Sequence, residues 1–168
     1  PGLTEAGFAL VKACNELGIM IDLSHMNEKG FWDVANTSSA PLVATHSNAH
    51  AVAASTRNLT DAQLEAIRDS RGVVGLNYAV GFLSPEGSRE TALPLEVMLR
   101  HTDHLLGILG EDGVALGSDF DGAGIPDAIL DVRGTQALLQ AMLDHGYGRE
   151  LVGKIALDNW LSVLERTW

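Results

Sequence analysis

The stretch GVVGLNY, residues Gly72–Tyr78, decides the fold that this sequence predicts. Apolar residues fill it almost without interruption, a pattern typical of a strand buried on both faces, and such strands belong to parallel sheets. A well-signalled helix precedes it, because Thr60 and Gln63 have the spacing of a capping box and Gly72 supplies a stop. A helix that leads directly into a buried strand indicates an α/β protein.

The same alternation repeats along the chain. We predict strands over 18–25, 41–46, 72–78 and 113–118, and helices over 5–17, 28–36, 61–71, 95–109, 135–145 and 148–166. Four such units, joined by right-handed crossovers, make a parallel sheet or a segment of a barrel. A complete (βα)8 (TIM) barrel needs about 250 residues. The 168 residues therefore correspond to half of one, closed by C-terminal helices.

The first helix has a signalled start and stop, since Thr4 can cap it and Gly18 can end it. Apolar residues recur in it at helical spacing, so we expect one of its faces to turn inward. The residues expected on that inward face are Ala6, Leu10, Cys14 and Leu17.

Length, charge and cysteine content narrow the class of protein. The chain is 46% hydrophobic, which suits a single domain over 1–168 with a buried core. Acidic residues outnumber basic ones 22 to 11, and the net charge of -11 argues against nucleic acid or an anionic membrane surface as the partner. Cys14 is the single cysteine, which excludes a disulfide framework and favours the cytoplasm.

Targeting signals are not evident in the sequence. No apolar run approaches the roughly 20 residues of a membrane helix, so we expect no membrane segment. The N-terminus lacks the basic and apolar regions of a signal peptide. The chain begins at Pro1 and enters a helix almost at once, as a fragment of a larger protein does.

Two histidines, His25 and His46, stand where predicted strands end. The carboxyl ends of parallel strands form the working face of an α/β protein, so we expect these imidazoles to converge. Zinc binds imidazole nitrogen and carboxylate oxygen where thiolates are scarce, and it accepts ligands from separate strands of a rigid scaffold. The alternative for either residue is a hydrogen-bonded histidine of the core or rim.

Asp119 and Arg57 are candidate partners of these histidines. Asp119 ends the fourth predicted strand, where it could hold a substrate amine or move a proton at a metal-bound water; alternatively it caps the following turn. Arg57 lies in the loop after the second strand, and its guanidinium suits two parallel hydrogen bonds to a carboxylate; alternatively it makes a surface salt bridge. Asn77 and Tyr78 also reach the working face, unless they satisfy backbone groups there.

The remaining histidines of interest are not assigned to the site. His101 and Asp103 match the letters of an His-x-Asp motif and His104 adds an i, i+3 partner, but all three fall inside the helix predicted over 95–109. We assign them to packing and to hydrogen bonds on the helix surface. We place His50 at the rim of the site and not among its ligands.

Four motifs occur in a characteristic order: IDLSH at Ile21–His25, APLVATHS at Ala40–Ser47, TRNL at Thr56–Leu59 and GSDFDG at Gly117–Gly122. They resemble the signatures of the membrane dipeptidase (renal dipeptidase) family of zinc metallopeptidases, in the amidohydrolase superfamily. The closing ALDNWL, at Ala156–Leu161, resembles the last helix of that family. The resemblance therefore covers essentially the whole chain.

The resemblance implies a (βα)8 barrel with two zinc ions that hydrolyses dipeptides, including some with a D residue on the C-terminal side. It implies that His25 and His46 bind the second zinc. It further implies that Arg57 grips the substrate carboxylate and that Asp119 is the acid beside the scissile bond. The zinc pair would activate a bridging water without a covalent intermediate.

The family pattern also includes groups that this chain lacks. These are the His-x-Asp pair of the first zinc, a bridging glutamate and a substrate-side histidine, all of which precede the matched segment. We therefore expect the C-terminal half of a zinc dipeptidase, inactive alone, that associates with the N-terminal half or with itself. The alternatives are a non-catalytic half-barrel that self-associates, and another metal-dependent amidohydrolase that acts on a cyclic amide or an ester.

Overall fold

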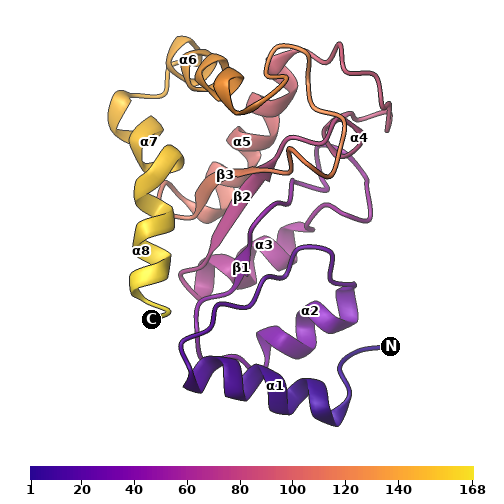
Figure 1. The fold of residues 1–168 in the computed structure, drawn as a ribbon, viewed down its shortest axis with the longest axis vertical. Helices are drawn as coiled ribbons and strands as arrows, with labels where there is room; N and C mark the ends of the chain where they lie inside the picture. Colours follow the sequence, from indigo (N-terminus) through magenta and orange to yellow (C-terminus); the bar gives the residue numbers. More distant parts are fainter.

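A three-stranded parallel sheet lies at the centre of the structure (Figure 1). The computed structural model describes residues 1–168, and the strand order is β1 (Val43–Ala44), β2 (Val73–Asn77) and β3 (Val114–Ser118). Every residue of the central strand β2 is buried, as its continuous apolar sequence predicts. The α/β class and the parallel arrangement are confirmed.

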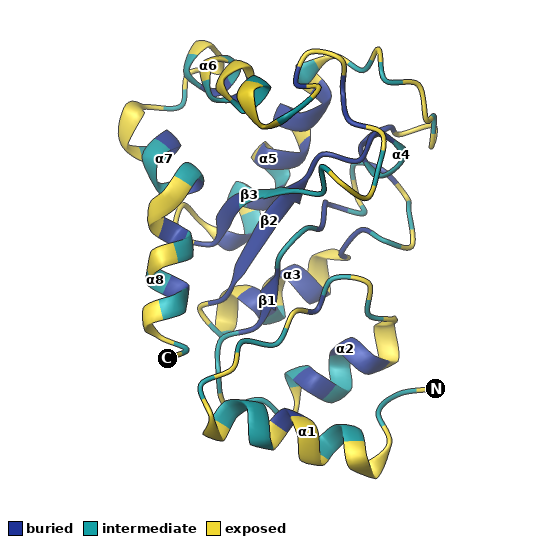
Figure 2. Cartoon of the chain, viewed as in Figure 1, coloured by how far each residue is buried: buried dark blue, intermediate teal, exposed yellow.

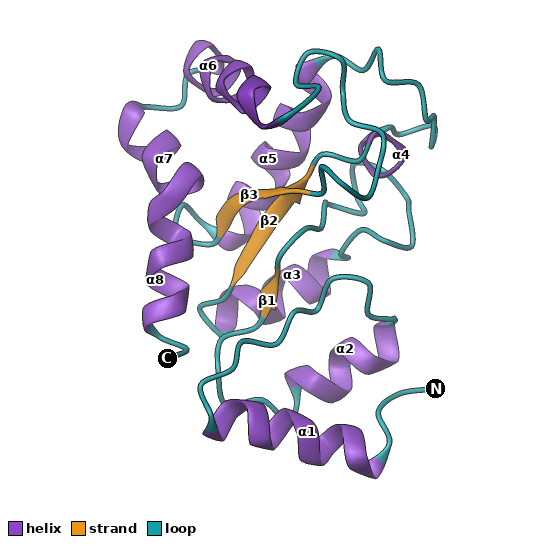
Figure 3. Cartoon of the chain, viewed as in Figure 1, coloured by secondary structure: helices purple, strands orange, loops and turns teal.

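Helices cover and flank this sheet, with α1 and α2 together at one end of the molecule and α6 at the other (Figures 1 and 3). No helix is both long and apolar enough to span a membrane. The helices are α1 (Glu5–Glu16), α2 (Glu28–Ala35), α3 (Asp61–Asp69), α4 (Val80–Leu83), α5 (Leu95–Leu109), α6 (Thr135–His145), α7 (Arg149–Gly153) and α8 (Asn159–Glu165). A 3-10 turn (Val132–Gly134) precedes α6, and a π-helical turn (Lys154–Asp158) joins α7 to α8.

Local sequence signals locate most helix ends correctly. The helices predicted over 95–109 and 135–145 have those bounds in α5 and α6. The capping box at the start of α3 is present, because the Thr60 hydroxyl accepts from Gln63 N while the Gln63 side chain accepts from Thr60 N. At the end of α1, Gly18 takes the left-handed φ of +66° that a glycine tolerates best.

The strand predicted over 18–25 is wrong in extent. Only one isolated parallel bridge forms there, between Asp22 and Val43. The Asp22 carboxylate accepts hydrogen bonds from Ser24 N and Thr45 N, both at 2.9 Å, so donors that could extend a ladder bind a side chain instead. The second predicted strand is likewise reduced to β1.

The inward face predicted for α1 is also wrong. Leu10 is 64% exposed and Leu17 is 73% exposed, whereas Val11 is the buried residue of this helix. The helix packs on α2 through the Val11 side, and nothing in the chain covers the opposite stripe. Periodicity located an apolar stripe but could not show which side the rest of the chain would occupy.

The last predicted helix, over 148–166, is divided into α7, the π turn and α8. α8 protects the outer edge of β3: Asn159 Nδ2 donates to Val114 O at 2.8 Å, and Trp160 Nε1 donates to Leu116 O at 2.9 Å. Side chains thus occupy carbonyls of β3 that a further strand could otherwise pair with.

The core lies between the sheet and the helices, and Figure 2 shows the buried residues concentrated along β2, the start of β3 and α5. On β2 and β3, Gly75 and Gly117 permit a close backbone approach. A Cβ on Gly75 would lie 2.0 Å from Thr45 O, and one on Gly117 would lie 2.3 Å from the same oxygen. These glycines let the segment that ends at His46 lie close against the sheet.

Candidate metal and substrate site

His25 and His46 meet at the carboxyl ends of their segments, as the sequence predicts. Their Nε2 atoms lie 2.9 Å apart and their ring centroids 4.9 Å apart. His25 has a φ of +66°, a left-handed conformation uncommon outside glycine that aims its ring across the strand ends. Burial, followed by the positive charge of Arg57, lowers the pKa of His25, so its neutral, ligating form is favoured.

A carboxylate lies behind His46. Asp22 Oδ2 accepts from Thr45 Oγ1 at 2.6 Å, and the same hydroxyl lies 2.7 Å from His46 Nδ1. Burial acts to raise the pKa of Asp22, but hydrogen bonds from Thr45 and Ser24 outweigh it and hold that pKa below its ordinary value. Asp22 is therefore an ionised acceptor, and His46 is oriented through the threonine.

Asp119 is tied to the same edge of the sheet by Asn77. Asn77 Nδ2 donates to Asp119 Oδ2 at 3.0 Å and to His46 O at 3.2 Å. Ser118 and Asp119 both have positive φ values, of +50° and +90°. Two consecutive non-glycine residues in this region carry a backbone cost of about 1–3 kcal/mol each, the kind of strain that clusters at functional sites.

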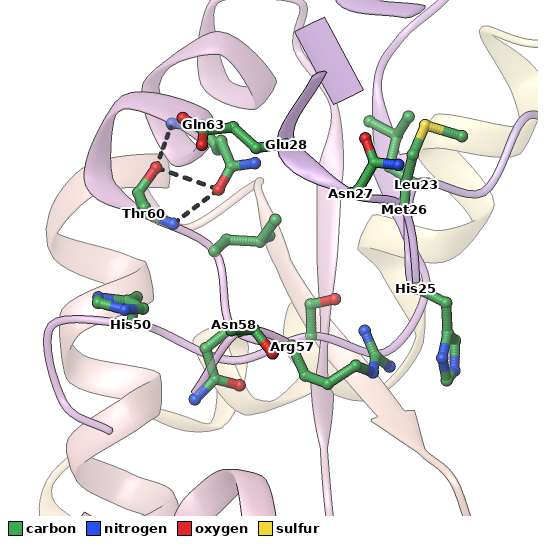
Figure 4. A pocket seen from close by; sticks show the side chains of 13 residues that line it. Leu23, His25, Met26, Asn27, Glu28, His50, Arg57, Asn58, Thr60 and Gln63 are labelled. Carbon is green, nitrogen blue, oxygen red and sulfur yellow. Dashed lines mark hydrogen bonds between the residues drawn. The ribbon is translucent and has the colours of Figure 1, made fainter. Parts of the chain in front are cut away.

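Arg57 lies within a polar cleft of about 510 Å³ that His25 also lines. Its guanidinium lies over the Phe82 ring, 5.2 Å from the centroid, and points toward His25 (Figure 4). Arg57 Nε and Nη2 are buried and have no hydrogen-bond partner in the chain. Burial lowers the pKa of Arg57, an effect that a bound anion would oppose.

Two buried side chains fix the loop that carries Arg57. Asn58 Nδ2 donates to Ala53 O at 2.9 Å and to Phe82 O at 2.8 Å. On α5, His101 Nδ1 accepts from Ala49 N at 3.2 Å, and its Nε2 donates to Leu83 O at 3.0 Å. The loop and α4 are therefore joined, which holds the Phe82 ring beneath the guanidinium.

The residues outside the predicted ligand set behave largely as expected. His101 is buried and hydrogen-bonded, His104 pairs with Asp61, and Asp103 accepts from Tyr147. His50 lines the cleft together with Arg57. Tyr78, predicted to reach the working face, is only 1% exposed, and burial raises its pKa to about 12, so it belongs to the core.

Three residues of the site were missed in the sequence: Asp22, Thr45 and Asn48. Asn48 pairs with the backbone of Asn77, accepting from its N at 3.0 Å and donating to its O at 3.1 Å, and so acts as a strand partner at the end of β2. Asp22 lies in the IDLSH motif and Thr45 in the APLVATHS motif. Their nearness to the two histidines was the available signal, and the pairing across 23 residues was the missing information.

Comparison with known proteins identifies the family. The sequence matches the membrane dipeptidase family (peptidase family M19) over residues 1–167. The chain belongs to this family. The predicted resemblance is confirmed.

Three relatives show how much of a family member is present. A metallopeptidase from Rhodobacter sphaeroides, solved with a phosphinate mimic of the dipeptide L-Ala-D-Ala, is 62% identical with a TM-score of 0.98; the match covers 99% of this chain and 48% of that one. An uncharacterised protein in the pqqA 5′ region of Klebsiella pneumoniae is 52% identical over 100% of this chain and 62% of that protein. Dipeptidase tcpJ of Claviceps purpurea (strain 20.1) is 32% identical over 97% of this chain and 38% of that protein.

The chain thus spans about half the length of the solved metallopeptidases that it matches. This agrees with the half-barrel predicted from its length and strand number, and the high TM-score shows that the half retains the geometry of the longer fold.

A member of a metallopeptidase family needs side chains whose donor atoms can bind the metal. This chain supplies some of them. His25 and His46 offer the imidazole nitrogens that zinc prefers. Nitrogens on a tetrahedral zinc lie about 3.3 Å apart when each bond is about 2.0 Å, so the observed 2.9 Å needs only a small opening. No group of three or more His, Cys, Asp or Glu side chains is placed to hold a metal. The residues present therefore fit half of one zinc coordination sphere.

Proposed function

We propose that this chain forms the substrate-carboxylate side and part of the second zinc site of a zinc-dependent dipeptidase. The observation that carries the proposal is the convergence of His25 Nε2 and His46 Nε2 beside a cleft that holds the unpartnered guanidinium of Arg57. Metal ligands and an anion clamp in one cleft suit a small substrate with a free carboxylate and a bond to be hydrolysed.

Arg57 binds the substrate in this proposal. Its Nε and Nη2 are the two donors of a bidentate guanidinium–carboxylate pair, and both are free of other partners. The Phe82 ring and the bonds of Asn58 hold the guanidinium in place, so little side-chain entropy is lost on binding. A dipeptide carboxylate held here lies with its peptide bond toward His25, because Arg57 points that way (Figure 4).

Asp119 handles the proton at the reacting end. Its carboxylate receives one hydrogen bond from Asn77, which orients it and leaves its other oxygen available to accept or return a proton. When bound, the zinc pair of the intact enzyme supplies a water of lowered pKa and polarises the peptide carbonyl. The isolated chain holds two of the required ligands, so we expect it to be inactive.

The test is an assay of the purified chain, and of a longer protein in which the N-terminal half of a family member precedes it, on L-Ala-D-Ala with added Zn²⁺. The chain should show no turnover above the blank, and the longer protein should hydrolyse the dipeptide. In the longer protein, Arg57→Ala should lower kcat/KM by about 100-fold or more, and Arg57→Lys should recover little, because lysine cannot form the bidentate pair. Substantial turnover by the chain alone would overturn the proposal that it carries only part of the catalytic site.

The same variant separates this proposal from an amidohydrolase that acts on uncharged cyclic amides or esters. Such an enzyme has no use for a carboxylate clamp. If Arg57→Ala leaves dipeptide turnover intact, the alternative substrate class is favoured.

A second candidate role is association with another chain, either the complementary half-barrel or a second copy. The exposed stripe on α1, with Leu10 and Leu17, favours it, because a stripe of this kind is usually covered. Sedimentation of the chain should show a dimer that Leu10→Lys together with Leu17→Lys converts to a monomer. Glu5→Lys with Glu16→Lys on the same helix is the matched control for charge, and a wild-type chain that sediments as a monomer contradicts self-association.

A further inference from the structure

The hydroxyl of Thr45 lies between a carboxylate and an imidazole. It is 2.6 Å from Asp22 Oδ2 and 2.7 Å from His46 Nδ1, whereas that carboxylate oxygen and Nδ1 are themselves 3.9 Å apart. Asp22 therefore cannot bond His46 directly at this distance. Any influence of the carboxylate on the ring must pass through the threonine.

The direction of these bonds follows from the single proton of a hydroxyl. An ionised carboxylate can only accept, so the Thr45 proton points to Asp22. The threonine oxygen must then accept from His46, which places a proton on His46 Nδ1. A neutral imidazole carries one ring proton, so His46 Nε2 is left with a free lone pair aimed at His25.

We propose that Asp22 and Thr45 are positioning residues that fix His46 in its Nδ1–H tautomer and thereby present Nε2 to the metal. The proposal rests on the proposed function for the role of that lone pair, whereas the tautomer itself does not depend on it. Partners that set the tautomer of a ligating histidine typically change metal affinity by about 10–100-fold when removed.

Main-chain groups also hold the Asp22–Thr45–His46 relay, the hydrogen-bonded chain from carboxylate to imidazole, in place. The second oxygen of Asp22 accepts from Ser24 N and Thr45 N, both at 2.9 Å, so both carboxylate oxygens are occupied. The Ser24 hydroxyl in turn accepts from His46 N at 3.0 Å. Hydrogen bonds therefore connect the carboxylate to the threonine, and the Ser24 hydroxyl to the main chain of the histidine.

The two histidines differ in this respect. Because His46 Nε2 has the lone pair, the 2.9 Å contact requires His25 Nε2 to donate. No side chain or carbonyl of the chain binds His25 Nδ1, so the proton of His25 can pass to Nδ1 when a metal takes Nε2. His46 is preset as a ligand, and His25 adapts.

Replacement of Asp22 by asparagine gives a distinctive expectation. In Asp22→Asn, Oδ1 must still face the N–H groups of Ser24 and Thr45, which places the amide NH2 toward the Thr45 hydroxyl. The hydroxyl then accepts from the amide and donates to His46 Nδ1, so His46 should invert to the Nε2–H tautomer. A purely structural role for Asp22 predicts no such inversion.

The experiment reads the ring nitrogens of His46 by ¹⁵N NMR in the metal-free chain at neutral pH. The wild type should show protonated Nδ1 and bare Nε2, Asp22→Asn should show the reverse, and Thr45→Val should lose the preference. Thr45→Ser keeps the hydroxyl and should retain the wild-type pattern. Thr37→Val, which removes a hydroxyl bonded to Asp33 O elsewhere in the chain, is the matched control. The same tautomer in wild type, Asp22→Asn and Thr45→Val would overturn the proposal.

A zinc titration of the same proteins separates this proposal from the proposed function. Asp22→Asn and Thr45→Val should weaken zinc binding by about 10–100-fold relative to wild type, and Thr45→Ser by less than about threefold. A wild-type chain with the Nδ1–H tautomer and no detectable zinc binding would contradict the proposed metal role while supporting the relay. If wild type binds zinc and Thr45→Val binds it equally well, the proposed effect of Thr45 on metal binding is overturned.

Discussion

The structure places histidines in two contrasting settings. At the carboxyl ends of the strand segments, His25 and His46 face one another with their Nε2 atoms 2.9 Å apart, and His25 lines the cleft that also holds Arg57. On α5, His101 is fully buried, and backbone groups of Ala49 and Leu83 occupy both of its ring nitrogens. Both settings contain hydrogen-bonded imidazoles, so hydrogen bonding alone does not separate a ligand from a structural residue.

The two settings differ in whether a ring nitrogen is left without a backbone partner. In the open pair the bonded nitrogen of His46 is Nδ1, and Nε2 is directed at the other ring and at the space between the strand ends. His101 has no nitrogen left to offer. A mutation should therefore affect metal binding at the open pair and folding at His101.

The largest effect is expected for His101→Ala. It leaves the Ala49 N–H and the Leu83 carbonyl buried and unpaired, at a cost of about 1–3 kcal/mol each, so the free energy of unfolding should fall by about 2–6 kcal/mol. Urea unfolding followed by tryptophan fluorescence measures it. His101→Asn can keep the bond from Ala49 and His101→Gln the bond to Leu83, so each should lose about half as much. A decrease below about 0.5 kcal/mol in His101→Ala would mean that the His101 hydrogen bonds, which join the loop to α4, do not stabilise the fold.

The next effect concerns acid stability. Burial lowers the pKa of His101 to about 4 from an ordinary value of 6.5. Because the folded-state pKa is the lower one, the unfolded chain binds the proton first, and this stability is present above pH 6.5 and lost as the pH falls toward 4. The shift corresponds to about 3 kcal/mol, at 1.36 kcal/mol per pH unit. With a chelator present, the free energy of unfolding of the wild type should therefore fall between pH 6.5 and 4, and it should fall more steeply than that of His101→Gln. Parallel pH profiles for the two proteins would show that His101 is not the titrating group.

The sequence predicted this contrast only in part. Strand-end position correctly predicted that His25 and His46 would meet, and position within a helix correctly predicted that His101 would pack against the rest of the chain. Helix ends were predictable because capping residues and glycine stops act locally, as at α3 and α5. These are features in which neighbours in sequence decide the structure.

What the sequence did not reveal depends on contacts between distant residues. The extent of the first strand was overestimated because the bonds of Asp22 to Thr45, 23 residues away, compete with the ladder. The relay through Thr45 was missed for the same reason. The inward face of α1 was misassigned because Leu10 and Leu17 form a stripe that nothing in this chain covers.

A third prediction concerns the open pair. His25→Asn should weaken zinc binding by at least about tenfold, equal to about 1.4 kcal/mol, because one of the two proposed imidazole ligands is lost. Asparagine tolerates the φ of +66° at this position, so the free energy of unfolding should change by less than about 0.5 kcal/mol. Isothermal titration with Zn²⁺ and urea unfolding measure the two quantities. A loss of stability without a loss of zinc affinity would place His25 with His101 in the structural class.

The smallest effect is expected for His104→Ala, one turn along α5 from His101. His104 Nε2 lies 2.7 Å from Asp61 Oδ1, but the side chains are 27% and 56% exposed, so solvent and salt screen the pair. Such a surface pair contributes about 0.2–1 kcal/mol, and Asp61 in the first turn of α3 keeps its favourable interaction with the helix dipole when the histidine is removed. The unfolding free energy should fall by less than about 1 kcal/mol, and the loss should shrink further in 0.5 M NaCl. A loss as large as that of His101→Ala would show that exposure on α5 does not separate the two histidines, and that the α3–α5 contact depends on the contact between His104 and Asp61.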